Sequence, residues 1–187
     1  WQPGPEKYVD IYRRIASAIR DVDPQARVGG PGVAKGKASD ERSISAWVSS
    51  LVQAAANDGL PLDYISAHWY GQSMQSIRDS HAAYRRLLEK YGLERCKLAV
   101  SEWNMSHTPY DGEVGGATYW AARAAYTMAA VITFVDCGID YSWIWQTVSG
   151  VVAPEFFSEW MSKERLRTMM ALRSRNALQV AHLLERD

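Results

Sequence analysis

A carboxylate flanked by an indole and an amide ends one short apolar segment of the chain, at Glu102-Trp103-Asn104. The preceding residues 97–101 contain the run Leu-Ala-Val, which is typical of a strand buried on both faces in a parallel sheet. Because side chains alternate along a strand, Leu98, Val100 and Glu102 are predicted to share the inward face. Glu102 then stands at the carboxyl end of a strand, where barrels of alternating strands and helices carry their chemistry. The simpler alternative is a strand that ends in a solvated glutamate.

Two further segments end in residues that suit the same chemistry. His68 and Tyr70 alternate with Trp69, and Trp143 alternates with Trp145 in a later segment. A phenol can keep a carboxylate ionised and fix its rotamer, and indole rings bind the C–H faces of sugars. The carboxylate can then attack or stabilise an oxocarbenium-like carbon. The pattern therefore predicts a carbohydrate site with Glu102 as the catalytic residue and, as substrate-binding residues, His68, Tyr70, Trp103, Asn104, Trp143 and Trp145.

Each of these residues also has a structural interpretation when it is taken alone. A single histidine such as His68 is more often a hydrogen-bonded core residue, and Trp143 alone more often packs inside a barrel. Tyr70 alone fits both interpretations equally. The functional interpretation is favoured because these residues lie together at the same end of consecutive predicted strands.

The elements that must position these residues alternate along the chain. Helical spacing predicts helices over residues 5–22, 40–59, 74–91 and about 117–135, and a last helix ending near Arg186. Strands are predicted over residues 27–31, 63–70, from 97, and over 140–145. This order predicts a parallel α/β sheet with right-handed crossovers, as in a barrel. A doubly wound sheet is the alternative, but Gly29-Gly30-Pro31-Gly32 is not a dinucleotide fingerprint.

Composition argues against several classes of function. The 21 basic and 21 acidic residues balance, so nothing points to nucleic acid or to a membrane surface. The longest apolar stretch, about residues 124–135, is too short to span a bilayer. Cys96 and Cys137 form no metal motif and are expected to be free thiols, although they could be neighbours. No metal or organic cofactor is implied. The chain has no initiator Met and no signal peptide, and its opening Trp1-Gln2-Pro3 suggests a fragment.

Four motifs together resemble strands five to eight of the clan A retaining glycoside hydrolases, and family 39, the β-xylosidases and α-L-iduronidases, most of all. The motifs are Val28-Gly29-Gly30-Pro31, Ile65 to Tyr70, Ser101-Glu102-Trp103-Asn104 and Trp143-Ile144-Trp145. The resemblance covers nearly the whole chain and implies a (β/α)8 barrel. It implies that Glu102 is the nucleophile, that Tyr70 hydrogen-bonds it, and that Trp145 lies under the sugar.

One part of the family pattern is missing. The clan's general acid/base is a Glu in an Asn-Glu-Pro motif at the end of strand four, and this chain contains no Asn-Glu pair. The resemblance implies that the motif would lie just before Trp1. Residues 1–187 are therefore interpreted as the C-terminal half of a glycosidase barrel, with the N-terminal half absent from this sequence.

Two functions follow from this interpretation. The first is a retaining glycosidase that acts on β-xylosides or similar short glycosides, with its acid/base Glu outside this sequence. The second is a non-catalytic, carbohydrate-binding or structural half-barrel. A sugar-phosphate enzyme is less favoured, because no glycine-rich phosphate loop follows the last strand. Four strands leave two open edges and an inward face that carries Val28, Ser66, Val100 and Trp143. We therefore expect the missing half or a second chain to cover this side.

Overall fold

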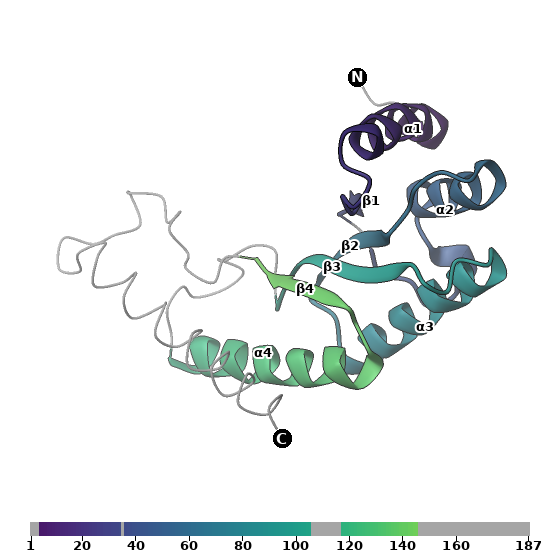
Figure 1. Ribbon diagram of the computed structural model, residues 1–187. Coiled ribbons are helices and arrows are strands. Elements are labelled where there is room, and N and C mark those ends of the chain that lie inside the picture. Colours follow the sequence, from purple (N-terminus) through teal and green to yellow (C-terminus); the bar gives the residue numbers. More distant parts are fainter. Residues whose placement is uncertain (1–3, 35, 106–116, 146–187) are drawn as a thin grey trace.

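The structure is a computed structural model that describes residues 4–34, 36–105 and 117–145, of which residues 117–121 are described in the backbone only (Figure 1). Its elements follow in the order α1 (Pro5–Val22), β1 (Gly29–Val33), a 3-10 turn (Glu41–Ser43), α2 (Ala46–Asp58), β2 (Tyr64–Tyr70), α3 (Met74–Lys90), β3 (Lys97–Asn104), α4 (Ala117–Cys137) and β4 (Tyr141–Ile144). The predicted last helix near Arg186 lies outside these residues.

The four strands form one parallel sheet in the order of the sequence, β1-β2-β3-β4. Figure 1 shows the helices as an arc on one side of the strands, from α1 through α2 and α3 to α4. This arrangement confirms the predicted parallel α/β sheet. The other face of the strands carries no helix of the described chain.

The main hydrophobic core lies between the sheet and α2, α3 and α4. The two central strands supply alternate residues to it, and the helices supply apolar residues at helical spacing. Fully buried members are Val48, Val52, Ile65, Trp69, Ile77, Tyr84, Leu88, Leu98 and Val100. Each such side chain contributes about 1.5–3 kcal/mol relative to full exposure, so burial of this face holds the strands on the helices.

Two element boundaries differ from the prediction for local reasons. Strand β1 begins at Gly29, two residues later than expected, because Val28 exchanges both of its backbone hydrogen bonds with Asp63. Asp40 was expected to cap a helix that runs to Gly59. Instead it caps the 3-10 turn through a reciprocal bond with Ser43, and α2 begins at Ala46. Gly59 ends α2 in a left-handed conformation, as predicted.

The amino ends of the strands are fastened by the same device twice. Asp63, just before β2, accepts hydrogen bonds from the Val28 N–H (2.7 Å) and from Arg20 of α1 (2.7 Å). Asp140, just before β4, accepts them from the Leu98 N–H (2.8 Å) and from Arg85 of α3 (2.7 Å). We call these the two aspartate clamps. Each clamp joins a helix, the strand that follows it, and the start of the next strand.

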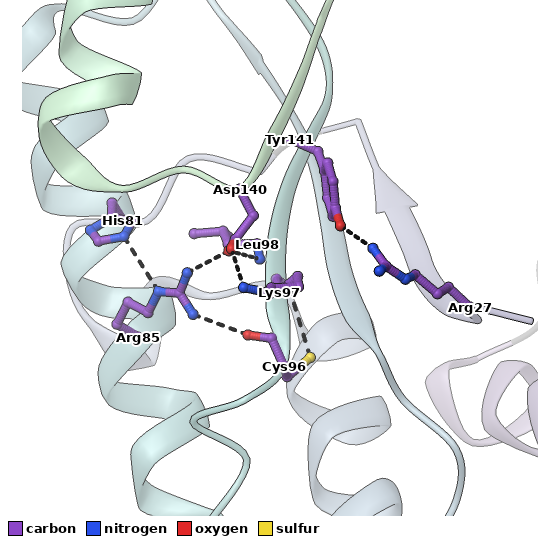
Figure 2. Close-up of polar contacts among 8 residues, drawn as sticks. All are labelled: Arg27, His81, Arg85, Cys96, Lys97, Leu98, Asp140 and Tyr141. Carbon is purple, nitrogen blue, oxygen red and sulfur yellow. Dashed lines mark hydrogen bonds and ion pairs between the residues drawn. The ribbon is translucent and has the colours of Figure 1, made fainter. Parts of the chain in front are cut away.

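The second clamp is reinforced by neighbouring charges, as Figure 2 shows. Lys97 Nζ lies 2.8 Å from Asp140, and Arg85 also donates to the Cys96 carbonyl oxygen. Partial burial raises the pKa of Asp140, but the hydrogen bonds from Lys97, the Leu98 N–H and Arg85 outweigh it. The pKa of Asp140 is therefore lower than usual.

Nearby, Arg27 donates to the hydroxyl of Tyr141 (Figure 2), although Arg27 precedes β1 and Tyr141 begins β4. Neighbouring strands lie about 4.8 Å apart, so in a flat sheet β1 and β4 would be about 14 Å apart. Arg27 and Tyr141 thus reach toward each other across β2 and β3 and link the two edge strands of the sheet.

We predict that Asp140→Asn destabilises the fold by roughly 2 kcal/mol at pH 7, because hydrogen bonds to a charged group contribute about 1.5–3 kcal/mol. The lowered pKa of Asp140 means that its contribution is complete above its unfolded pKa of about 3.9. The contribution is lost as the pH falls through the folded pKa. The difference between wild type and variant in urea unfolding should therefore be large at neutral pH and shrink below about pH 4.

The matched control is Asp58→Asn. Asp58 also pairs with an arginine, Arg13, at 2.6 Å, but the two side chains are 43% and 46% exposed. An exposed pair contributes about 0–1 kcal/mol, so this variant should unfold nearly as wild type does. Equal destabilisation by both variants would show that the clamp has no special weight.

Candidate active site

A single extra residue in β3 determines which way Glu102 faces. Val100 is paired with Ala67 of β2, and the next pair is Glu102 with His68, so Ser101 has no partner in β2. The pairing of β3 with β4 shifts over the same stretch. A bulge of this kind re-aims the side chains that follow it. The prediction that Leu98, Val100 and Glu102 share a face is therefore wrong: Leu98 and Val100 lie in the core on the helix side, fully buried.

The bulge places Trp103 on the helix side of the sheet, opposite Glu102. Trp103 is only 2% exposed and belongs to the core between sheet and helices. Its ring packs edge-on against Phe134 of α4, with centroids 5.1 Å apart. We expected Trp103 to bind substrate, but the structure does not bring its ring to the other site residues.

Glu102 lies between two side chains of β2, the strand next to it. The hydroxyl of Tyr70 donates to Oε2 of Glu102 at 2.8 Å, as the resemblance implied. Nδ1 of His68 lies 3.3 Å from the same oxygen. The side chains of Glu102 and His68 are 29% and 19% exposed, so both are accessible to a ligand from one side. Three predicted site residues thus converge at the carboxyl ends of β2 and β3.

The phenol of Tyr70 is held in its protonated form. Partial burial, the hydrogen bond to Glu102 and the negative charge of Glu102 all raise the pKa of Tyr70 well above its usual value near 10. Tyr70 is therefore a hydrogen-bond donor to Glu102 at every physiological pH. Its donation in turn fixes the position of the Glu102 carboxylate.

Asn104 has a structural role that the sequence did not predict: its side chain binds the backbone at the carboxyl ends of β3 and β4. It is 4% exposed, and its Nδ2 donates to the Trp145 carbonyl oxygen at 2.7 Å while its Oδ1 accepts from the Met105 N–H at 2.8 Å. The Trp145 N–H donates to the Trp103 carbonyl oxygen at 2.9 Å. These bonds tie the carboxyl ends of β3 and β4 together and fix the backbone of Trp145.

The two tryptophans of the β4 segment are the exposed aromatic rings near this edge. Trp145 is 46% exposed and Trp143 is 54% exposed. The ring of Trp143 stacks on that of Tyr141, with centroids 6.0 Å apart, which places it toward the base of the strand. Trp145 lies at the same end of the sheet as Glu102, and Trp143 one step below.

The described residues contain no group of three His, Cys, Asp or Glu side chains that could hold a metal ion. Within the same ranges, no helix is long and apolar enough to cross a membrane. Cys96 and Cys137 are both free, as expected.

We predict that Glu102→Gln lowers the pKa of the Tyr70 phenol, because the amide removes the negative charge that opposes phenolate formation. The pKa should stay above its usual value of about 10, since burial remains its largest cause. Tyrosine 13Cζ NMR against pH measures this directly, with Tyr70→Phe to assign the signal. An unchanged pKa would mean that the carboxylate does not act on Tyr70.

The sequence of this chain resembles those of known proteins. The sequence model of glycosyl hydrolases family 39 matches residues 2–135. A β-xylosidase of Caldicellulosiruptor saccharolyticus is 32% identical over 123 residues, which cover 59% of this chain and 23% of that protein. A β-xylosidase of Geobacillus stearothermophilus is 25% identical over 122 residues, covering 56% and 23%. The chain thus matches less than a quarter of the length of these relatives.

Solved structures show the same fold. A glucosidase from Croceicoccus marinus superimposes with a TM-score of 0.70 at 22% identity, over 94% of this chain and 37% of that one. A family 39 β-xylosidase from Caulobacter crescentus gives a TM-score of 0.58 at 24% identity, over 74% and 27%. The curved parallel sheet with its outer helices is therefore half of a (β/α)8 barrel, as predicted. On the family match, which spans most of its residues, the chain belongs to family 39 of the glycosyl hydrolases.

Proposed function

We propose that the complete protein is a retaining glycosidase that acts on β-xylosides or similar short glycosides, with Glu102 as its nucleophile. The observation that carries this proposal is the hydrogen bond from Tyr70 to Glu102, with His68 beside the same oxygen, at the carboxyl ends of two adjacent barrel strands. The β-xylosidases among the relatives support the class of substrate.

The arrangement suits attack by an ionised carboxylate. Oε2 of Glu102 is the oxygen that Tyr70 and His68 contact, so Oε1 is the oxygen left to attack the anomeric carbon. Attack forms a glycosyl-enzyme ester and releases the leaving oxygen, which takes a proton from the general acid. Water activated by the same acid/base residue then cleaves the ester and restores the carboxylate. Tyr70 acts by holding the rotamer of Glu102.

The acid/base residue is proposed to lie in the strand that precedes α1, outside this sequence. Retaining glycosidases keep their two carboxyl groups about 5–5.5 Å apart, so this strand must bring its Glu to that distance from Glu102. A strand that leads through α1 into β1 lies beside β1 in a right-handed crossover. The open edge of β1 is therefore the place for it. The rings of Trp145 and Trp143 are proposed to line the sugar site from the β4 side.

We predict that Glu102→Gln in the complete enzyme lowers kcat by at least about 1000-fold, which corresponds to about 4 kcal/mol of barrier. The fold should persist, because an amide has nearly the shape of a carboxylate and Glu102 ends a strand. Hydrolysis of aryl β-xylosides measures kcat, and circular dichroism follows unfolding. A 2-fluoroxyloside with an activated leaving group should label Glu102 covalently, as mass spectrometry of the digest would show.

Glu89→Gln is the matched control, since Glu89 is exposed near the end of α3, away from the site. It should leave both hydrolysis and labelling unchanged. Labelling of another carboxylate in the wild type would remove Glu102 as the nucleophile. A complete wild-type enzyme without glycosidase activity would favour a non-catalytic binding function instead.

Exposed apolar side chains lie at both lateral edges of the half-barrel, on the β1 side and on the β4 side. On α1, Ile15 is 55% exposed and forms a stripe with Ile11 and Ile19 along a groove of about 270 Å³ that reaches Val28 and Tyr64. At the β4 edge, large apolar side chains of the described residues that are exposed are Ile132 and Val135 of α4 and Trp143 and Trp145 of the β4 segment. Contiguous apolar surface of this kind marks a contact with another part of a protein.

We propose that the other half of the barrel, within the same enzyme, covers both edges. The relatives are long enough to contain such a half, because the chain covers only 23% of the length of the β-xylosidases it matches. Four further strands would pair with the free edges of β1 and β4 and close the barrel. The same closure would bring the acid/base residue to Glu102.

We predict that residues 1–187 alone self-associate and lack activity on unactivated glycosides. Co-expression of the other half of the enzyme should prevent the self-association and restore hydrolysis. Size-exclusion chromatography with light scattering gives the state of association. A monodisperse monomer of 187 residues that unfolds cooperatively and hydrolyses such a substrate would contradict the prediction.

A further inference from the structure

A short segment after β1 is fastened across the end of β2 by buried hydrogen bonds. We call residues 36–38 the Gly36 strap. The Gly36 N–H donates to the His68 carbonyl oxygen at 3.1 Å. The Gly36 carbonyl oxygen accepts from Trp69 Nε1 and from the Tyr84 hydroxyl, each at 3.0 Å. The Ala38 N–H donates to Ser80 Oγ at 3.1 Å.

The strap lies directly on the backbone of β2. A Cβ atom on Gly36 would overlap the Cβ of Ala67 and would lie 2.9 Å from the His68 carbonyl oxygen. Only glycine therefore allows this approach. The contact falls on Ala67 and His68, the point at which the pairing of β2 with β3 shifts. The strap thus supports β2 exactly where its regular ladder to β3 is interrupted.

The residues that the strap supports are those that face Glu102. His68, which the strap holds by its carbonyl group, contacts Glu102, and Tyr70 follows two residues later with its own hydrogen bond to the same carboxylate. A shift of the β2 backbone at this point would move both partners of Glu102 at once. The geometry of the carboxylate therefore depends on the strap.

Tyr84 is the part of this support that comes from a helix. It lies on α3, is fully buried, and packs against the ring of Trp69 with centroids 6.2 Å apart. Burial raises the pKa of Tyr84, so its hydroxyl stays a donor at physiological pH. We infer that Tyr84 is a positioning residue for the glycosidase reaction: through the Gly36 carbonyl group it fixes the end of β2 and with it the two side chains that orient Glu102. The inference rests on the proposed function.

The test compares Tyr84→Phe with Tyr12→Phe in the complete enzyme. Tyr12 is a matched control, because this buried residue also donates from a part-buried hydroxyl to a backbone carbonyl group, that of Pro61, at 2.8 Å, but at the amino end of β2. Each variant loses one such hydrogen bond, and both should melt a few degrees lower than wild type. Tyr84→Phe should in addition lower kcat about 10-fold or more with KM within about twofold, since small misplacement of catalytic groups has large effects on turnover. Tyr12→Phe should keep both constants.

Two further measurements make the result independent of how well one variant folds. Hydrogen–deuterium exchange should be faster in peptides that contain Gly36 in Tyr84→Phe, and unchanged there in Tyr12→Phe. Ser80→Ala releases the other end of the strap and should lower kcat in the same direction. Equal effects of Tyr84→Phe and Tyr12→Phe on kcat, or a change confined to KM, would overturn the inference. A wild-type enzyme that hydrolyses no glycoside would instead overturn the proposed function.

Discussion

The site depends on one extra residue in β3. Without the bulge at Ser101, strict alternation would place Glu102 on the helix side with Leu98 and Val100. A carboxylate there would lie in an apolar core, where burial of its charge is costly. With the bulge, Glu102 faces Tyr70 on the inner side and Trp103 fills the core position. The same irregularity therefore fills the core and leaves the carboxylate partly exposed, which explains why a fully buried indole directly follows Glu102.

The two ends of the sheet do different work. At the amino ends, the two aspartate clamps join charged side chains to backbone N–H groups and hold the strands in place. At the carboxyl ends, the same strands depart from regular pairing, and hydrogen bonds from the Gly36 strap and from Asn104 replace part of the ladder. Regular structure held by charged side chains at one end thus lies opposite irregular structure around the candidate site at the other. Proteins of this architecture place stability and chemistry at opposite ends of the barrel in the same way.

Periodicity predicted the elements well, because helices and strands that bury one face must repeat their apolar residues. Family motifs added the pairing of Tyr70 with Glu102, which no local pattern contains. Leu98 and Val100 were predicted wrongly to share the face of Glu102, since a bulge depends on the neighbouring strands and has no marker in the sequence Ser-Glu-Trp-Asn. Trp103 was assigned to the site because it adjoins Glu102 in the sequence, although its ring packs on Phe134. The fixed position of the segment around Gly36 has no marker in the sequence, because it comes from buried partners distant in sequence.

The aspartate clamps also bear on how such a chain can be made. Asp63 binds the backbone of a residue 35 positions earlier, and Asp140 one that is 42 positions earlier. Each clamp therefore joins consecutive strands and needs no residue beyond the start of the second strand. Closing a loop between nearer residues costs less entropy, and synthesis delivers the amino-terminal units first. A barrel built of such units can acquire its strand order step by step during synthesis, leaving only the closing of the ring for the end.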